Sequence, residues 1–161
     1  MLDDSSLDVL ARENFFPLPR ALYAELLEVA KDFGAQAVGF DIIFKEPSAR
    51  GQEDDEALAE AISNTGFPVV VVAERGSSGP VEILRRSKNI AWGHTHTLPA
   101  VDGVFRKLDM DGATFASKLA TGSHSGWIHF APEGGIVKVP LYNVLQSKFS
   151  PELKNELLPK L

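Results

Sequence analysis

One apolar stretch, residues 37–44 with the sequence AVGFDIIF, constrains the fold of this chain most strongly. It lies between the turn-forming residues Gly34 and Pro47, and Asp41 is its only charged residue. An apolar run of this length between turn formers predicts a β-strand that is buried on both faces. A carboxylate inside such a strand must be paired, protonated, at the strand's mouth or part of a site, because burying an isolated charge is too costly.

Two interpretations of Asp41 follow from the residues alone. A buried partner such as Arg20, Arg106 or a histidine is the more economical one. The other makes Asp41 a nucleophile at a strand end, as in phosphoryl-transfer enzymes. Those enzymes usually carry a second acid two residues later, and this chain has Ile43 there, so the nucleophile interpretation is the weaker of the two.

Length, charge and cysteine content exclude several classes of protein. The chain has 161 residues, which suffices for one domain with a hydrophobic core. A net charge of −6 and a pI near 5.2 argue against a surface for nucleic acid. No cysteine is present, so disulfides, thiolate metal sites and cysteine nucleophiles are excluded. No run approaches the roughly 18 apolar residues of a membrane span, which predicts a soluble chain, either cytoplasmic or part of a larger protein.

The first half of the chain alternates between helical and strand patterns. A 3.6-residue apolar period predicts a helix from Arg20 to Phe33, before Gly34. The acids of residues 53–56 begin a second helix, and we interpret them as a solvated helix start rather than an ion site. The β-branched run of residues 69–73 predicts a second core strand. This order predicts a parallel sheet covered by helices.

The second half predicts further short elements. They are a short helix in residues 81–87, strands in 89–97, 104–110 and 127–130, a helix in 113–120, an apolar segment with tight turns in 137–145, and a last helix from Ser150-Pro151 toward Leu158. The strand of residues 104–110 is expected to be antiparallel or at a sheet edge. The sequence therefore predicts an α/β fold with a mixed, mainly parallel sheet flanked by helices, in a single domain.

The motif with a chemical character is His94-Thr95-His96. Residues two apart share one face of a strand, so both imidazoles could bind one metal ion, with Asp41 as a third ligand. Open α/β sheets bind their ligands at such strand ends. Two histidines are a weak signal, however, and structural histidines at a strand end are favoured. A small cytoplasmic metal-dependent hydrolase using Asp41, His94 and His96 is therefore the alternative function.

A set of motifs occurs along almost the whole chain in a fixed order. They are Pro19-Arg20, residues 34–44 (GAQAVGFDIIF), 54–61 (DDEALAEA), Gly93-His94, 102–107 (DGVFRK), Phe115-Ala116, 128–130 (IHF) and 139–145 (VPLYNVL). Together they resemble the CHASE-type sensory extracellular domain of the second class, which is associated with cyclases and histidine kinases.

This resemblance implies that residues 1–161 are one sensory domain on the extracytoplasmic side of a bacterial membrane receptor. One membrane helix would precede the domain, and a further strand and several membrane helices would follow Leu161. The output would be a nucleotide cyclase, a histidine kinase or a serine/threonine kinase. The resemblance supplies no catalytic residues, and we expect no cofactor and no metal.

A binding role follows for this domain rather than an enzymatic one. We expect an unknown small-molecule ligand or protein partner, a homodimeric receptor, no nucleic acid, and membrane contact only through the flanking helices. Sheet geometry places the expected pocket at the strand ends, bordered by Asp41, residues 45–52, His94, His96 and Arg106. A dimerisation module without any ligand is a third possibility.

Overall fold

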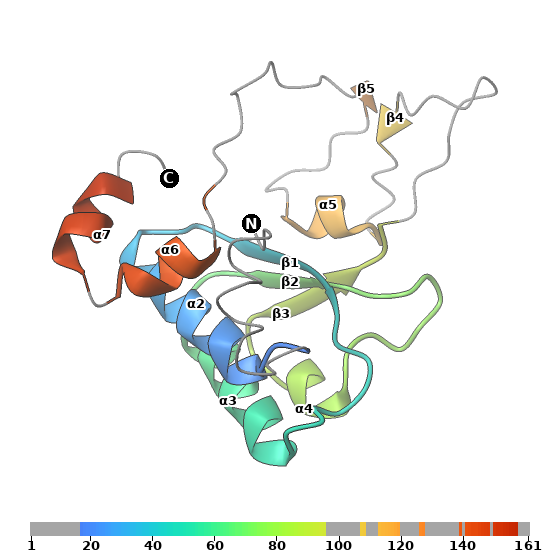
Figure 1. Ribbon diagram of the computed structural model, residues 1–161. Helices are drawn as coiled ribbons and strands as arrows, with labels where there is room; N and C mark the ends of the chain where they lie inside the picture. Colours follow the sequence, from blue (N-terminus) through green and yellow to red (C-terminus); the bar gives the residue numbers. More distant parts are fainter. Residues whose placement is uncertain are drawn as a thin grey trace.

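A three-stranded parallel sheet is the centre of the protein, as a computed structural model shows (Figure 1). The structure describes residues 17–95, 107–108, 113–119, 126–127, 139, 141–148 and 150–157. The strands are β1 (Val38–Ile43), β2 (Val69–Val72) and β3 (Ile90–Gly93), in the spatial order β1-β2-β3. Both pairings are parallel, so the carboxyl ends of all three strands meet at one edge of the sheet.

Helices cover both faces of this sheet. On one face lie α2 (Arg20–Asp32), α3 (Gln52–Asn64) and α4 (Glu82–Arg85), and on the other lies α5 (Phe115–Leu119) (Figure 1). Because α3 connects β1 to β2 and α4 connects β2 to β3, the chain forms two consecutive β-α-β units. The predicted α/β class, with its mainly parallel sheet, is therefore confirmed.

The core lies between the sheet and the layer of α2, α3 and α4. Its buried apolar side chains come from α2, β1, α3, β2, α4 and the connections between them: Leu27, Phe40, Phe44, Leu58, Ile62, Phe67, Val69, Val71 and Leu84. The ring of Tyr23 packs edge-on against Phe40 and Phe44, with centroid distances of 5.5 Å in both cases. The first helix is thereby fixed against β1.

The strand that is buried on both faces is β2 and not β1. All four valines of β2 are buried, whereas β1 lies at an edge of the sheet and buries only Phe40. The pairing of β1 also shifts register between Phe40 and Ile43. Asp41 falls within this irregularity and is exposed. The expectation of a buried Asp41 that needs a partner was therefore wrong, because an edge strand leaves the carboxylate in solvent.

The remaining described elements differ in part from their predictions. An antiparallel pair, β4 (Lys107–Leu108) and β5 (Gly126–Trp127), forms a two-stranded sheet separate from the parallel one. Residues 141–146 form the helix α6 (Leu141–Gln146), where the sequence suggested only tight turns. The helix α7 (Pro151–Leu157) begins after Ser150 as expected, and the Ser150 hydroxyl accepts a hydrogen bond from the Leu153 N–H group.

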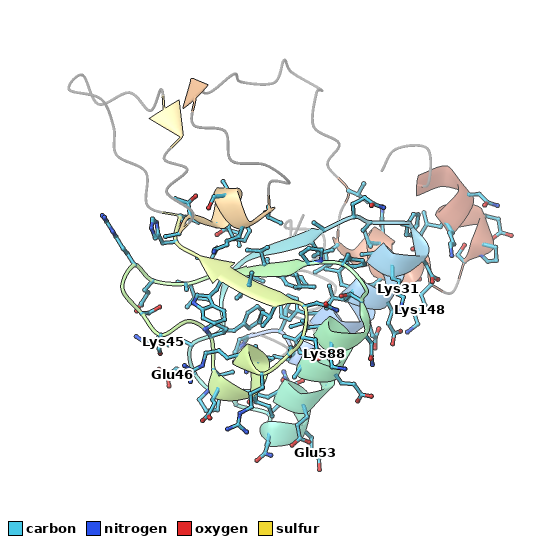
Figure 2. All side chains as sticks on the ribbon, turned by 180° about the vertical axis from the view of Figure 1, so that it is seen from behind. Lys31, Lys45, Glu46, Glu53, Lys88 and Lys148 are labelled. Carbon is cyan, nitrogen blue, oxygen red and sulfur yellow. The ribbon has the colours of Figure 1, made fainter. Side chains whose placement is uncertain are left out.

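The last two helices lie close to α2. Lys148, which follows α6, forms an ion pair of 2.7 Å with Glu28, and Lys154 of α7 forms one of 3.2 Å with Asp32. Figure 2 shows Lys148 near Lys31 at the same end of α2. Over the described residues, no helix combines the length and the hydrophobicity that crossing a bilayer requires.

Candidate ligand-binding site

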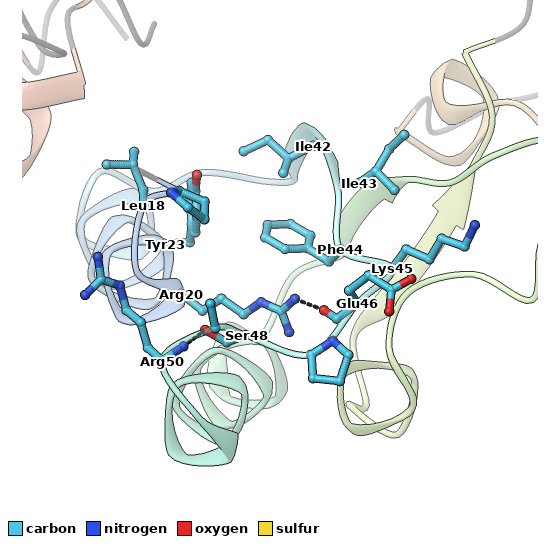
Figure 3. Close-up of a pocket in the computed structure, with 13 residues that line it drawn as sticks. Leu18, Arg20, Tyr23, Ile42, Ile43, Phe44, Lys45, Glu46, Ser48 and Arg50 are labelled. Carbon is cyan, nitrogen blue, oxygen red and sulfur yellow. Dashed lines mark hydrogen bonds between the residues drawn. The ribbon is translucent and has the colours of Figure 1, made fainter. Parts of the chain in front are cut away.

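A cavity of about 500 Å³ opens at the carboxyl end of β1, between that strand, the start of α2 and residues 45–50 (Figure 3). Its apolar lining consists mainly of Pro17, Leu18, Tyr23, Ile42, Ile43 and Phe44. Its polar lining comes from Arg20, Lys45, Glu46, Ser48 and Arg50. The volume falls within the range of sites for small molecules, and the location agrees with the strand-end position expected for an open α/β sheet.

The apolar walls are held in place by the core. Leu18 and Phe44 are buried, while Tyr23 packs on Phe44. Burial raises the pKa of Tyr23, so its phenol stays protonated at neutral pH and can donate a hydrogen bond. Ile43 differs from these residues because its side chain is 51% exposed, which is large for an isoleucine. A bound molecule at this position would cover apolar surface that now faces water.

Arg20 is the buried cation beneath this cavity. Its guanidinium forms an ion pair with Asp55, donates a hydrogen bond to the carbonyl of Glu46, and lies 5.4 Å from the centroid of the Phe44 ring. Burial lowers the pKa of Arg20, and the nearby carboxylate of Asp54 acts in the opposite direction. An arginine always remains charged under such conditions, so its carboxylate partners are needed to hold it in the protein.

Asp54 and Asp55 supply these carboxylates, and both are buried, with 9% and 3% of their surface exposed. The interpretation of the acidic run as a solvated helix start was therefore wrong for these two residues. Burial alone would raise the pKa of Asp54, but hydrogen bonds from Ser48, Arg20 and Ala21, together with the charge of Arg20, outweigh burial and lower it. Glu53, in contrast, projects from the start of α3 into solvent, as Figure 2 shows.

The same two carboxylates hold the segment of residues 45–50, which we call the lip of the cavity. The Ser48 hydroxyl donates to Asp54 at 2.5 Å, and the Ser48 N–H group donates to Asp55 at 3.1 Å. The Arg50 N–H group in turn donates to the Ser48 hydroxyl oxygen at 3.1 Å. The lip, the start of α2 and the start of α3 are thus joined in one buried polar network.

Sequence reasoning did not find this network. Arg20 and the two acids are separated by more than 30 positions, so no local pattern links them. The signal that was available is that Pro19-Arg20 and residues 54–61 both belong to the motifs on which the family resemblance is based.

A second cavity, of about 490 Å³, lies at the carboxyl ends of β2 and β3. Ile43, Val72, Glu74, Arg75, His94 and Thr95 contribute to its lining. Ile43 therefore lines both cavities, which flank the end of β1. Lys45 and Glu74 form an exposed ion pair of 3.0 Å between the two.

The structure places the predicted site residues as follows. His94 lines the second cavity and forms a parallel bridge with Thr114, which links the end of β3 to the start of α5. Asp41 is not among the residues that line either cavity. His96 and Arg106 lie outside the described residues. The lip contributes to the first cavity, as the sequence predicted for residues 45–52.

The metal hypothesis gains no support from the part of the chain that is described. Within it, no group of three or more His, Cys, Asp or Glu side chains is arranged to hold a metal ion. The set of Asp41, His94 and His96 includes one residue outside that part, so the hydrolase alternative stays a prediction.

The model of the CHASE2 domain matches residues 1–157, nearly the full length of the chain. The chain belongs to the CHASE2 family. CHASE2 domains are sensory extracellular domains of membrane receptors, which agrees with the sensory role expected from the sequence. Searches among curated proteins and among solved structures found no match to this CHASE2 domain.

Proposed function

We propose that this CHASE2 domain is the ligand-sensing input domain of a transmembrane signalling receptor and lies on the outer side of the cytoplasmic membrane. The observation that carries the proposal is the family match over residues 1–157. The output domain would be a nucleotide cyclase, a histidine kinase or a serine/threonine kinase, and the receptor would act as a homodimer.

The ligand would bind at the carboxyl ends of the strands, where two cavities flank β1. The residues proposed for this region are the lip and His94, and His96 and Arg106 stay predictions from the sequence. Asp41 lines neither cavity. Binding would shift the receptor between two conformations by the difference in affinity for them, and a tenfold difference corresponds to about 1.4 kcal/mol. A ligand with equal affinity for both conformations would produce no signal.

The buried network offers a route by which ligand binding in the cavity could change the structure elsewhere in the domain. The lip borders the cavity, and Ser48 of the lip donates to the same Asp54 carboxylate that accepts from the backbone of Arg20 and Ala21. A movement of the lip would therefore change the capping of α2. Because burying unpaired polar groups is costly, the network favours discrete arrangements over gradual deformation.

Membrane topology provides the decisive test, and the absence of cysteine from the chain makes it simple. In the parent receptor, Glu53→Cys places a thiol on an exposed residue, and Val70→Cys places one on a fully buried residue. Intact cells are treated with a membrane-impermeant maleimide, and labelling of the receptor is measured. The receptor without an introduced cysteine serves as the background control.

We expect Glu53→Cys to be labelled in intact cells, and Val70→Cys to be labelled only after denaturation. Labelling of Glu53→Cys that requires permeabilised cells would place the domain in the cytoplasm. That result would overturn the proposed function, whatever the domain binds.

A further inference from the structure

The charges that line the first cavity differ in sign from the protein as a whole. The chain carries a net charge of −6. Three cations, Arg20, Lys45 and Arg50, line this cavity, against one carboxylate, that of Glu46. Two carboxylates, Asp54 and Asp55, lie behind Arg20, and Lys45 and Arg50 are the cations at the rim. Among the side chains that a bound molecule would contact, cations therefore outnumber carboxylates, which favours an anionic group.

The rim cation Lys45 can exchange its partner at little cost. It pairs with Glu74, but both side chains are about half exposed, at 53% and 52%. Exposed ion pairs of this kind contribute little to stability, because water screens them. A ligand carboxylate could therefore replace Glu74 without a large loss. The buried pair of Arg20 and Asp55 is different, since separating it would leave a charge buried.

The interior of the cavity favours an apolar body. Leu18, Ile42 and Phe44 form its walls, and Ile43, which is about half exposed, also contributes to its lining. Removing apolar surface from water is favourable, so these walls favour a compact hydrocarbon group. The hydroxyl of Tyr23 has no hydrogen-bond partner among the described residues, and Figure 3 shows it at the Leu18 and Ile42 side of the cavity.

From this combination we infer that the first cavity binds a small amphipathic carboxylate, with an aromatic or branched apolar body against Leu18, Ile42 and Phe44 and its carboxylate at the cationic rim. This inference rests on the proposed sensory function, because it names the ligand class for the same region. Polar ligands without an apolar part would leave Ile43 exposed. Cationic ligands would meet Lys45 and Arg50.

Three probes with the same phenylethyl group and a planar head group of matched size separate charge from shape: 3-phenylpropanoate, its neutral amide 3-phenylpropanamide, and the cation 3-phenylpropanamidine. Binding of each probe to the 161-residue chain is measured by NMR titration of backbone amides. We expect 3-phenylpropanoate to bind about tenfold more tightly than the amide, which corresponds to one charge-assisted hydrogen bond, and the amidine to bind most weakly. The amides that shift should belong to the lip and to residues 42–44.

Matched variants assign the charge preference to the rim. Arg50→Gln and Lys45→Gln should each reduce the preference for the carboxylate over the amide by about threefold, as expected for exposed charges. Arg86→Gln removes an exposed arginine that does not line this cavity, and it should leave the preference unchanged. Tyr23→Phe keeps the packed ring and removes the hydroxyl, so thermal unfolding of this variant checks that any loss of binding is not a loss of folding.

An amide that binds as tightly as the carboxylate would overturn the inference. The same holds if none of the three probes binds, if the shifted amides lie away from the lip, or if Arg86→Gln and the rim variants have equal effects. These outcomes are separate from the topology test. Labelling of Glu53→Cys in intact cells together with no probe binding would reject the ligand class and leave the sensory role in place.

Discussion

The carboxylate of Asp54 accepts a hydrogen bond of 2.9 Å from the backbone N–H group of Arg20, although the two residues lie 34 positions apart. Its other oxygen accepts from the next backbone N–H group, that of Ala21, also at 2.9 Å. The first turn of α3 thereby caps the N-terminus of α2. Pro19, the residue before α2, provides no side-chain cap of its own, so this helix depends on a distant acid.

Replacement of Asp54 by alanine should lower the free energy of unfolding by about 2–4 kcal/mol, because the helix cap and a partner of the buried Arg20 are lost together. Urea denaturation measures this change. The matched control is Glu53→Ala, an exposed acid in the same turn, which should cost less than about 1 kcal/mol. Equal losses for the two variants would mean that only the charge of the helix start matters.

Replacement of Arg20 by methionine should destabilise the protein by about 3–5 kcal/mol, because Asp55 would remain buried without its cation. Arg20→Lys should recover only part of this loss. A lysine keeps the charge, but it lacks the planar group that pairs with Asp55, binds the Glu46 carbonyl and lies over Phe44. Full stability of Arg20→Lys in urea denaturation would contradict the role assigned to the guanidinium.

Asp54 should also determine part of the acid sensitivity of folding. Its pKa is lowered in the folded protein, so its stabilising contribution is complete above the unfolded value of about 3.9 and is lost as the pH falls through the lower, folded value. The urea midpoint of the wild type should therefore decrease below about pH 4. Asp54→Asn should show a smaller decrease over the same range. If the urea midpoints of the two proteins decreased equally at acidic pH, the sensitivity would be due to other carboxyl groups.

Local patterns were sufficient to predict most of the parallel sheet and its helices. The 3.6-residue apolar period of residues 20–33 and the valine run of β2 both reflect which side chains are buried, and such patterns can be recognised in the sequence directly. The assignment of burial between strands was wrong, because β1 and β2 are both apolar and only the spatial order makes β2 central. The apolar pattern of β1 therefore did not reveal that Asp41 is exposed.

The binding region was predicted only in part for a similar reason. The position of a cavity at the strand ends follows from the α/β topology, and residues 45–50 were expected there. The buried state of Asp54 and Asp55 depends on Arg20, and an acidic run has the same local pattern whether a distant arginine covers it or water does. The helix α6 was missed, because residues 137–145 suggested only an apolar segment with tight turns.

Two glycines provide a final prediction about how α5 is held on the sheet. A Cβ atom at Gly93 would lie 2.5 Å from the Phe115 nitrogen and the Thr114 carbonyl carbon, which are backbone atoms that cannot turn away. A Cβ atom at Gly39 would instead meet the ends of two side chains, Leu119 at 2.6 Å and Phe115 at 2.8 Å, and side-chain ends can adopt other rotamers. Gly93→Ala should therefore cost about 1–3 kcal/mol in the free energy of unfolding, and Gly39→Ala less than about 1 kcal/mol.

Hydrogen exchange should show faster exchange for the Phe115 amide, which donates to the His94 carbonyl at 2.9 Å, in Gly93→Ala alone. If Gly39→Ala were the more damaging change, the close approach of the two backbones at Gly93 would not be what positions α5.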